Sequence, residues 1–327
     1  MDPAPNPTPQ SVPRVSVVIP TFNGAVRLPR VLAALAAQTA ADGSFEVVVV
    51  DNASTDDTGV VAREDVAAGR LRDRGVEVRV IAEPRQGTTY ARICGVLESK
   101  SDLVCFLDDD NIPEREYIAH GLVVFEDPSV DLVVSRIFPR WEIAPPPSII
   151  RRQHLYAVNE YLGDAAIDWG AEGTIVPTIT AGMWVRREAF LKAIPCDRID
   201  LLVAGRVGSQ LFCGEDIEIG VLIGKAGYRR SYAPSLRIEH EIPRWRLDTE
   251  YVIRLIEGIV RGELTLREKY EGAKFGFYDR AIAALRLVAA ICAIPALALM
   301  RRDARREIAF VMADRWARLR GPLRGDE

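Results

Sequence analysis

The segment VSVVIPTFNG, residues 15–24, determines the expected fold. Its first part, residues 15–20, is a short β-branched run closed by proline, which is typical of a buried strand. A helix over residues 28–35 is expected next, because leucine and valine recur there at intervals of three and four positions. Residues 45–50, FEVVVV, repeat the buried-strand pattern. A strand, a helix and a second strand in this order predict a parallel β–α–β unit.

The alternation of strands and helices continues along the chain. Further strands are predicted at residues 76–82, 103–107 and 131–137, and helices are predicted to begin near residues 55–58 and to cover residues 88–98, 149–162, 186–193 and 215–226. From about residue 247 onward the pattern is helical. These elements predict a Rossmann-like α/β fold, with a mostly parallel sheet flanked by helices and a helical C-terminal extension.

The composition is that of an ordinary globular protein. The 327 residues are 48% hydrophobic and 27% charged, which excludes a wholly disordered chain, a collagen and a multispan membrane protein. A net charge of −4 gives no global attraction to nucleic acid. The five cysteines are widely spaced and form no CxxC motif, so neither a zinc site nor a disulfide framework is expected, and a reducing, cytoplasmic compartment fits best.

Polar residues follow three of the predicted strands, at residues 20–24, 51–52 and 108–111. Ligands of parallel sheets bind beyond the carboxyl ends of the strands. The most specific of these segments is the triplet Asp108–Asp110, because adjacent carboxylates repel one another unless a cation or hydrogen-bond donors neutralise them. Mg²⁺ or Mn²⁺ is the natural cation, since hard ions share carboxylates with substrate phosphates. A solvated acidic turn is the alternative interpretation.

Two further features carry candidate chemistry. Glu215 and Asp216 follow Gly214 at the start of a predicted helix, where they either stabilise the helix dipole or include a general base that deprotonates an acceptor hydroxyl. His240 lies between two glutamates and is either structural or the completion of a metal site begun by the aspartates.

Residues 86–92, QGTTYAR, could bind a diphosphate. Gly87 lets the chain turn into a helix and Arg92 lies one turn inside it, although a surface arginine would give the same pattern. The dinucleotide motif GxGxxG, the Walker A motif, GxSxG and HExxH are absent from the sequence.

Six segments in this order resemble family 2 glycosyltransferases of the GT-A fold. They are VSVVIPTFNG (15–24), VVVVDNASTDDT (47–58), QGTTYARICG (86–95), FLDDDNIP (106–113), TAGMWVRREAF (180–190) and GEDIEIG (214–220). Within the family, DDDN, GRVGSQ, GED and HEIPRWRL are most similar to bacterial polysaccharide-biosynthesis transferases of the hormogonium-polysaccharide type. The resemblance implies a GT-A catalytic domain over residues 14–245. The proline-rich segment 1–13 is expected to be a disordered lead-in, and residues 246–327 are expected to form a helical extension, with membrane association as one possibility.

The resemblance also implies a donor site. The implied donor-binding residues are Pro20, Thr21, Asn23, Asp51, Arg92, Asp108 and Asp109. Among them, Asp51 corresponds to the residue that binds the base or ribose, and the triplet corresponds to the DxD motif. Asp110 would ligate the divalent metal directly, Asp108 would bind ribose or reach the metal through water, and His240 would complete the metal site.

The implied reaction is an inverting sugar transfer. Asp216, with Glu215 in the same ED motif, would deprotonate the acceptor hydroxyl, and the donor would be a nucleotide sugar, with a UDP-sugar expected. The QxxRW motif of processive synthases is absent, because Arg244-Trp245 follows Ile242-Pro243, so a non-processive enzyme is predicted. Trp141, Trp184 and Trp245 are either sugar-stacking platforms or packing residues.

The sequence of the C-terminal region does not decide whether it contacts a membrane. Residues 281–300 are nearly apolar but contain Arg286 and Pro295, and an arginine cluster follows. This stretch is a buried helix, an interfacial helix on anionic lipid or a membrane span. Contact with the inner face of the cytoplasmic membrane would suit a polyprenyl-linked acceptor; a glycan acceptor is the alternative.

Two other functions remain open. A nucleotidyltransferase on a related sheet would want a Gly-rich loop containing lysine after the first strand, and residues 20–27, PTFNGAVR, lack the lysine. A degenerate scaffold that only binds sugar nucleotides would be expected to have lost the triplet or the ED pair.

Overall fold

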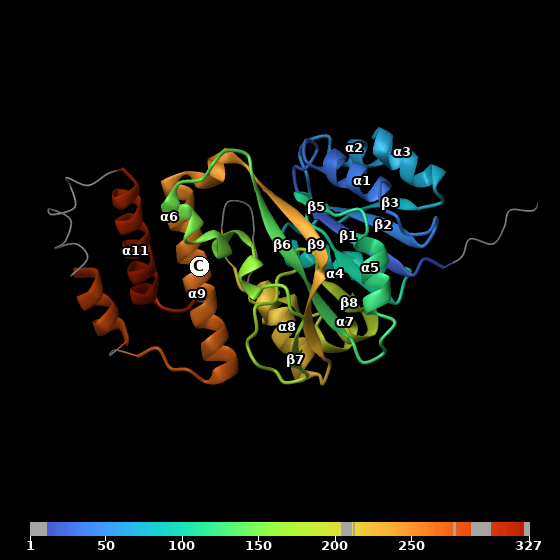
Figure 1. The fold of residues 1–327 in the computed structure, drawn as a ribbon. Coiled ribbons are helices and arrows are strands. Elements are labelled where there is room, and N and C mark those ends of the chain that lie inside the picture. Colours follow the sequence, from blue (N-terminus) through green and yellow to red (C-terminus); the bar gives the residue numbers. More distant parts are fainter. Residues whose placement is uncertain (1–11, 204–210, 212, 277–278, 289–301, 324–327) are drawn as a thin grey trace, which may run out of the picture.

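The computed structural model describes residues 12–203, 211, 213–276, 279–288 and 302–323. Within this part, the strands form a nine-stranded sheet in the order β3-β2-β1-β4-β8-β6-β9-β5, with β7 paired to β9 (Figure 1). The strands are β1 (Val15–Thr21), β2 (Phe45–Asp51), β3 (Val78–Ala82), β4 (Leu103–Phe106), β5 (Asn111–Pro113), β6 (Leu132–Trp141), β7 (Ile167–Gly170), β8 (Trp184–Arg186) and β9 (Arg230–Ile242).

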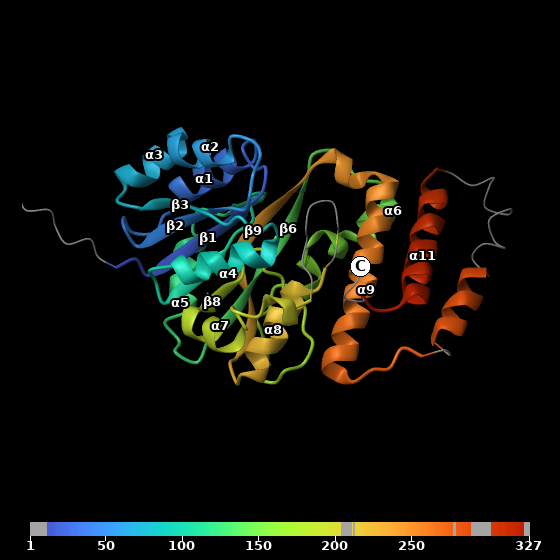
Figure 2. The same cartoon turned by 180° about the vertical axis from the view of Figure 1, so that it is seen from behind.

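Helices cover both faces of the sheet, since α5 lies in front of it in Figure 1 and α4 lies in front of it in the opposite view of Figure 2. The α-helices are α1 (Leu28–Ala36), α2 (Thr58–Glu64), α3 (Val66–Asp73), α4 (Thr88–Glu98), α5 (Tyr117–Val124), α6 (Pro147–Ile150), α7 (Arg187–Ala193), α8 (Glu215–Lys225), α9 (Thr249–Glu271) and α11 (Arg302–Arg320). The 3₁₀ turns are η1 (Gln153–Tyr156), η2 (Glu160–Leu162), η3 (Ile199–Leu201) and η4 (Arg244–Leu247). Residues 279–288 are also helical.

The buried-strand prediction is confirmed by two separate apolar clusters. Val17 and Val47 face the cluster that contains α1, α3 and α5, whereas Val18 and Val48 face the cluster that contains α4, α7 and α8. Because successive side chains of a strand point to opposite faces, a strand covered on both sides is apolar at nearly every position. This is why residues 15–20 and 45–50 are almost continuously hydrophobic.

The sheet is parallel in its first half and mixed in its second half. β1 pairs in parallel with β2 and β4, and β2 pairs in parallel with β3. Beyond β4, β8 runs antiparallel to β4 and β6, β5 and β7 run antiparallel to β9, and β6 runs parallel to β9. The expected α/β class is confirmed, while the expectation of a mostly parallel sheet applies to β1–β4 only.

The predicted helix over residues 149–162 is wrong. The segment contains the end of α6, followed by η1 and η2, and Ala157 between them has a left-handed φ of 55°. Asn159 is buried, accepts a hydrogen bond from Ile137 N at 2.7 Å and donates to Ser135 O at 2.8 Å. Because its amide side chain is bonded to the β6 backbone, the segment follows the sheet edge and cannot continue as one helix.

The C-terminal extension forms its own apolar core. α9 and α11 lie side by side next to α6 in Figures 1 and 2, and their side chains pack with Ile149, Tyr156 and Ile242. Among the described residues, no helix is both long enough and apolar enough to cross a bilayer. Most of the apolar stretch 281–300, namely residues 289–300, lies outside the described residues, as does most of the predicted lead-in.

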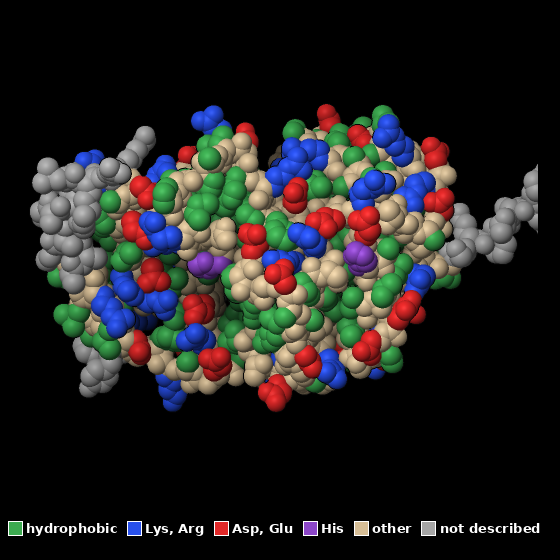
Figure 3. Space-filling model, viewed as in Figure 1, with side chains coloured by type: hydrophobic (Ala, Val, Ile, Leu, Met, Phe, Trp, Pro, Cys, Tyr) green, Lys and Arg blue, Asp and Glu red, His purple; other side chains and the backbone are tan. Residues whose placement is uncertain are grey.

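Acidic and basic side chains are interspersed on the molecular face shown in Figure 3. Such mixing fits the small net charge of the sequence.

We expect Gly121→Ala to destabilise the protein by about 1–3 kcal/mol. A methyl group at position 121 would lie 2.2 Å from Cζ2 of Trp184, a fully buried side chain held by a hydrogen bond to Tyr117. The control is Gly69→Ala on α3, where nothing lies within 4 Å of the added methyl group. Denaturant unfolding of both variants measures the difference, and equal free energies of unfolding would contradict the expectation.

Candidate active site

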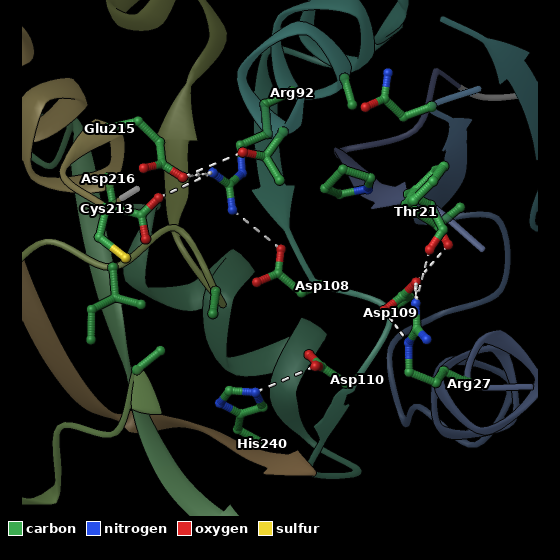
Figure 4. Close-up of a pocket in the computed structure, with 18 of the residues that line it drawn as sticks. Thr21, Arg27, Arg92, Asp108, Asp109, Asp110, Cys213, Glu215, Asp216 and His240 are labelled. Carbon is green, nitrogen blue, oxygen red and sulfur yellow. Dashed lines mark hydrogen bonds and ion pairs between the residues drawn. The ribbon is translucent and has the colours of Figure 1, made fainter. Parts of the chain in front are cut away.

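A pocket of about 320 Å³ lies beyond the carboxyl ends of β1 and β4 (Figure 4). One wall comes from the β1 end and the triplet, with His240 and Arg246 beside Asp110, and the opposite wall comes from the start of α8. Nine of the predicted site residues line it: Pro20, Thr21, Arg92, Asp108, Asp109, Asp110, Glu215, Asp216 and His240. Residues that are more than 100 positions apart in the sequence therefore share one cavity.

Asn23 and Asp51, two predicted donor-binding residues, are not among the lining residues. The Asn23 side chain accepts a hydrogen bond from Thr55 N at 2.8 Å, and its backbone has a left-handed φ of 49°. Asp51 accepts from Ser54 N at 3.1 Å. In this structure both side chains bond to the loop that follows β2, next to the pocket wall formed by Asn52.

Each aspartate of the triplet has its own arginine partner. The three ion pairs are Asp108–Arg92 at 3.3 Å, Asp109–Arg27 at 2.8 Å and Asp110–Arg246 at 3.1 Å. Three adjacent carboxylates are tolerated here because each is neutralised from a different direction. The arginines come from the loop before α1, from α4 and from η4.

Asp109 belongs to the pocket floor. Both of its oxygens are bonded by Arg27, with Nε on Oδ1 and Nη2 on Oδ2, each at 2.8 Å. Thr21 donates a further hydrogen bond to Oδ2 at 2.5 Å. Burial raises the pKa of the Asp109 carboxyl above its ordinary value, and the hydrogen bonds from Arg27 oppose that shift. A bidentate, buried pair of this kind orients the triplet.

Arg92 connects the two walls of the pocket. Its Nη1 lies 3.1 Å from Asp216 Oδ1 and 3.5 Å from Glu215 Oε1, and its Nη2 lies 3.3 Å from Asp108 Oδ1 (Figure 4). Only 4% of Arg92 is exposed. Burial acts to lower its pKa, but the charges of Asp216, Asp108 and Glu215 outweigh burial and raise it. Arg92 is thus a permanent cation shared by three carboxylates.

The carboxylates of the ED pair differ in their surroundings. Asp216 Oδ1 accepts hydrogen bonds from Thr180 at 2.6 Å and from Arg92, and 29% of the side chain is exposed. Glu215 is almost buried and accepts from Thr88 Oγ1 at 3.3 Å. Only Asp216 therefore combines a fixed orientation with access to a ligand in the pocket.

His240 reaches the triplet because β5 pairs with β9. Their antiparallel register sets Asn111 opposite His240, and the His240 Nε2 atom lies 3.4 Å from Asp110 Oδ2. The other ring nitrogen, Nδ1, contacts the carbonyl oxygen of Tyr156 at 2.8 Å, and Nε2 contacts Arg246 Nη1 at 3.0 Å. A carbonyl can only accept and a guanidinium can only donate, so Nδ1 carries the proton and Nε2 presents a lone pair.

The pair Asp110–His240 fits a divalent cation. A neutral imidazole whose Nδ1–H is bonded to a backbone carbonyl is the usual form of a metal-binding histidine. Two neighbouring ligands of an octahedral Mg²⁺ ion lie about 3 Å apart, which is close to the observed 3.4 Å. Asp108 does not join them, because its carboxylate is bonded to Arg92, and the described residues contain no cluster of three such ligands.

The tryptophan alternatives are settled for Trp184, which is fully buried and packs against Phe125 and Tyr117. It is a core residue and not a sugar platform. Trp141 makes an edge contact with Tyr156, and Trp245 is 53% exposed.

Arg27, Thr180 and Arg246 were not predicted from the sequence. The signal that could have indicated the two arginines is the triplet itself, since three adjacent carboxylates, two of them buried, require several cations. No local pattern identifies which of the chain's many arginines supply them.

The fold and the pocket define a protein of the GT-A class. Solved structures with this arrangement include a mannosyltransferase from Pyrobaculum calidifontis in complex with GDP-Man and Mn²⁺, which is 20% identical, has a TM-score of 0.60, and aligns over 97% of this chain and 90% of that chain. TarS from S. aureus is 14% identical, has a TM-score of 0.50, and aligns over 94% of this chain and 54% of that chain. These similarities concern the fold.

The sequence profile of glycosyl transferase family 2 matches residues 16–194, more than half of the chain. The chain belongs to this family, as its motifs predicted. The hormogonium-polysaccharide subtype stays a prediction, and residues 205–210 of its GRVGSQ motif lie outside the described residues.

Curated relatives match over part of their length. Glycosyltransferase AglE of Haloferax volcanii is 34% identical over 123 residues, which cover 38% of this chain and 39% of the relative. The pre-mycofactocin glycosyltransferase of Mycobacterium tuberculosis is 27% identical over 241 residues, which cover 72% of this chain and 45% of the relative. The matched segments thus span less than half of either relative.

We expect Arg92→Ala to lower the free energy of unfolding by about 3 kcal/mol, because it leaves the buried Glu215 and the partly buried Asp108 and Asp216 without their shared cation. The loss should be larger at pH 7 than near pH 4, which is about the pKa of an aspartate in an unfolded chain. The pKa of the Asp108 carboxyl is already raised in the native protein. Burial is the largest cause, the charge of Arg92 opposes it, and the charges of Asp110 and Asp216 add to it. Without Arg92 the folded state takes up more protons than the unfolded state, so its stability falls as the pH rises.

Urea unfolding at both pH values measures this difference. Arg70→Ala, at an exposed position of α3, is the control and should change neither value. A loss that is independent of pH would contradict the role of Arg92 as the shared cation.

Proposed function

We propose that the protein is an inverting, metal-dependent, non-processive glycosyltransferase that uses a nucleotide sugar. The observation that carries the proposal is the connection of the DxD aspartate Asp108 to the ED aspartate Asp216 through Arg92 in one pocket. A transferase needs a diphosphate site and a general base on opposite sides of one anomeric carbon. The two walls of this pocket meet that requirement.

On the donor side, Asp110 and His240 would hold Mg²⁺ or Mn²⁺. Two protein ligands are enough, because Mg²⁺ in phosphate-handling sites is usually bound by one or two carboxylates, several waters and substrate phosphates. When bound, the cation would neutralise the leaving diphosphate. The bound GDP-Man and Mn²⁺ of the Pyrobaculum calidifontis mannosyltransferase support a site of this kind. Pro20, Thr21 and Asp108 would contact the nucleotide.

On the acceptor side, Asp216 is the proposed general base. Thr180 and Arg92 both bond to Oδ1, and in the described part of the chain no side chain bonds to Oδ2. Oδ2 is therefore available to an acceptor hydroxyl. Glu215 is better suited to positioning Arg92, because it is nearly buried and lies 3.5 Å from that guanidinium.

The transfer is a single displacement. The acceptor oxygen forms a bond to the anomeric carbon, the bond from that carbon to the diphosphate oxygen breaks, and the acceptor proton passes to Asp216. Attack opposite to the leaving group inverts the anomeric configuration. Arg92 and Thr180 hold the Asp216 carboxyl group in a fixed orientation for this proton transfer.

The finer assignments rest on the motifs. A UDP-sugar donor, a glycan or polyprenyl-linked acceptor, and a role in bacterial polysaccharide synthesis follow from the family resemblance. A cytoplasmic enzyme at the inner face of the membrane would reach a polyprenyl-linked acceptor, and the apolar stretch 281–300 favours that location.

Asp216→Asn should reduce sugar transfer by about 10²- to 10⁴-fold while donor binding is retained, because the amide cannot take up the acceptor proton. Donor consumption and donor affinity are measured on the same preparation. Asp73→Asn, an exposed change on α3, should leave both unchanged. Transfer at the native rate in Asp216→Asn would exclude Asp216 as the base.

A thermal-shift panel of UDP-, GDP- and TDP-sugars, with Mn²⁺ or with a chelator, tests the donor site. A donor at 100 times its dissociation constant should add roughly 2.7 kcal/mol of stability. The shift should require Mn²⁺ and should be lost in Asp110→Asn. A folded protein that responds to none of the donors would favour the degenerate scaffold instead.

A further inference from the structure

The Arg246 guanidinium lies where a divalent cation would contact its two protein ligands. Nη2 is 3.1 Å from Asp110 Oδ2 and Nη1 is 3.0 Å from the lone pair of His240 Nε2. Asp110 Oδ2 and His240 Nε2 are the same two atoms that would ligate a divalent cation. The guanidinium and a cation cannot bind these two atoms at the same time, because an ion bound to both would lie within contact distance of the guanidinium.

The backbone of Arg246 is anchored independently of its side chain. The Tyr156 hydroxyl donates to the Arg246 carbonyl oxygen at 3.0 Å, and Leu247 in the same 3₁₀ turn is buried. Apart from Asp110 and His240, the guanidinium makes weaker interactions than the backbone does. Its Nε has no hydrogen-bond partner in the described part of the chain, and its remaining contact is a ring contact 5.5 Å from the centroid of the exposed Trp245. The side chain can therefore leave Asp110 without unfolding η4.

We propose that Arg246 is a displaceable counter-cation that makes metal binding conditional on the donor. This inference rests on the proposed function. In the absence of a donor, Arg246 neutralises Asp110 and competes with a metal ion. A nucleotide diphosphate changes the balance in two ways, because it brings additional oxygen ligands for the cation and offers the displaced guanidinium a new anionic partner.

The proposal predicts a measurable coupling between metal and nucleotide. Coupling is reciprocal, so the nucleotide should tighten Mn²⁺ binding by the same factor by which Mn²⁺ tightens nucleotide binding. Removing the Arg246 side chain should strengthen the binding of Mn²⁺ alone and weaken that coupling.

The test is a titration with Mn²⁺, followed by the electron paramagnetic resonance signal of the free ion, with and without UDP or GDP. Arg246→Ala should bind Mn²⁺ alone on the order of tenfold more tightly than the native protein, which corresponds to the loss of one charge-assisted contact. Arg246→Lys, which keeps the charge but loses the two-pronged contact, should gain less. Arg244→Ala, at an exposed position two residues earlier, is the matched control and should bind like the native protein.

Asp110→Asn combined with Arg246→Ala should lose the gain, because the gain requires the Asp110 ligand. Circular dichroism of each variant establishes that it is folded, and Arg246→Lys serves if Arg246→Ala is not. If Mn²⁺ binds with a nucleotide but Arg246→Ala binds Mn²⁺ alone no more tightly than the native protein, the role of Arg246 is overturned while the metal site stands. If no variant binds Mn²⁺ even with a nucleotide, the proposed metal site is overturned as well.

Discussion

Asp108, Asp109 and Asp110 lie next to one another just after β4, and their mutual repulsion constrains much of the surrounding structure. Each must have a positive partner, and one short segment cannot supply three cations in the required directions. The partners come instead from the loop before α1, from α4 and from η4. The strand order that joins β1 to β4 and β9 to β5 brings these segments to one edge of the sheet.

The same pairing pattern organises the chemistry. Arg27 binds both carboxylate oxygens of Asp109 and fixes the orientation of the central aspartate. Arg92 joins Asp108 to Asp216, the aspartates of the proposed donor and acceptor sides. Arg246 faces the pair that would bind a metal. The three ion pairs are similar in chemistry but differ in their surroundings, and each arginine therefore has a different role.

The parts of the fold that follow local rules could be predicted from the sequence. β1 and β2 are buried on both faces and are therefore almost continuously apolar, and the ends of these strands indicated the pocket. β9 was missed, although Leu236, Ile238 and Ile242 alternate with charged residues as expected of a strand with one buried face. Nine site residues were found through motifs. The partners Arg27 and Arg246 were not, because only tertiary pairing distinguishes them from other arginines.

Tyr156 belongs to two regions at once. Its ring packs in the core of the C-terminal extension with residues of α9 and α11, while its carbonyl group contacts the imidazole of His240. The predicted domain boundary near residue 245 therefore does not separate the pocket from the C-terminal extension in the folded structure. The packing of α9 and α11 thus helps to hold Tyr156, whose carbonyl group orients the imidazole of His240, so a substitution at the interface of these two helices should be felt at a ring that lines the cavity.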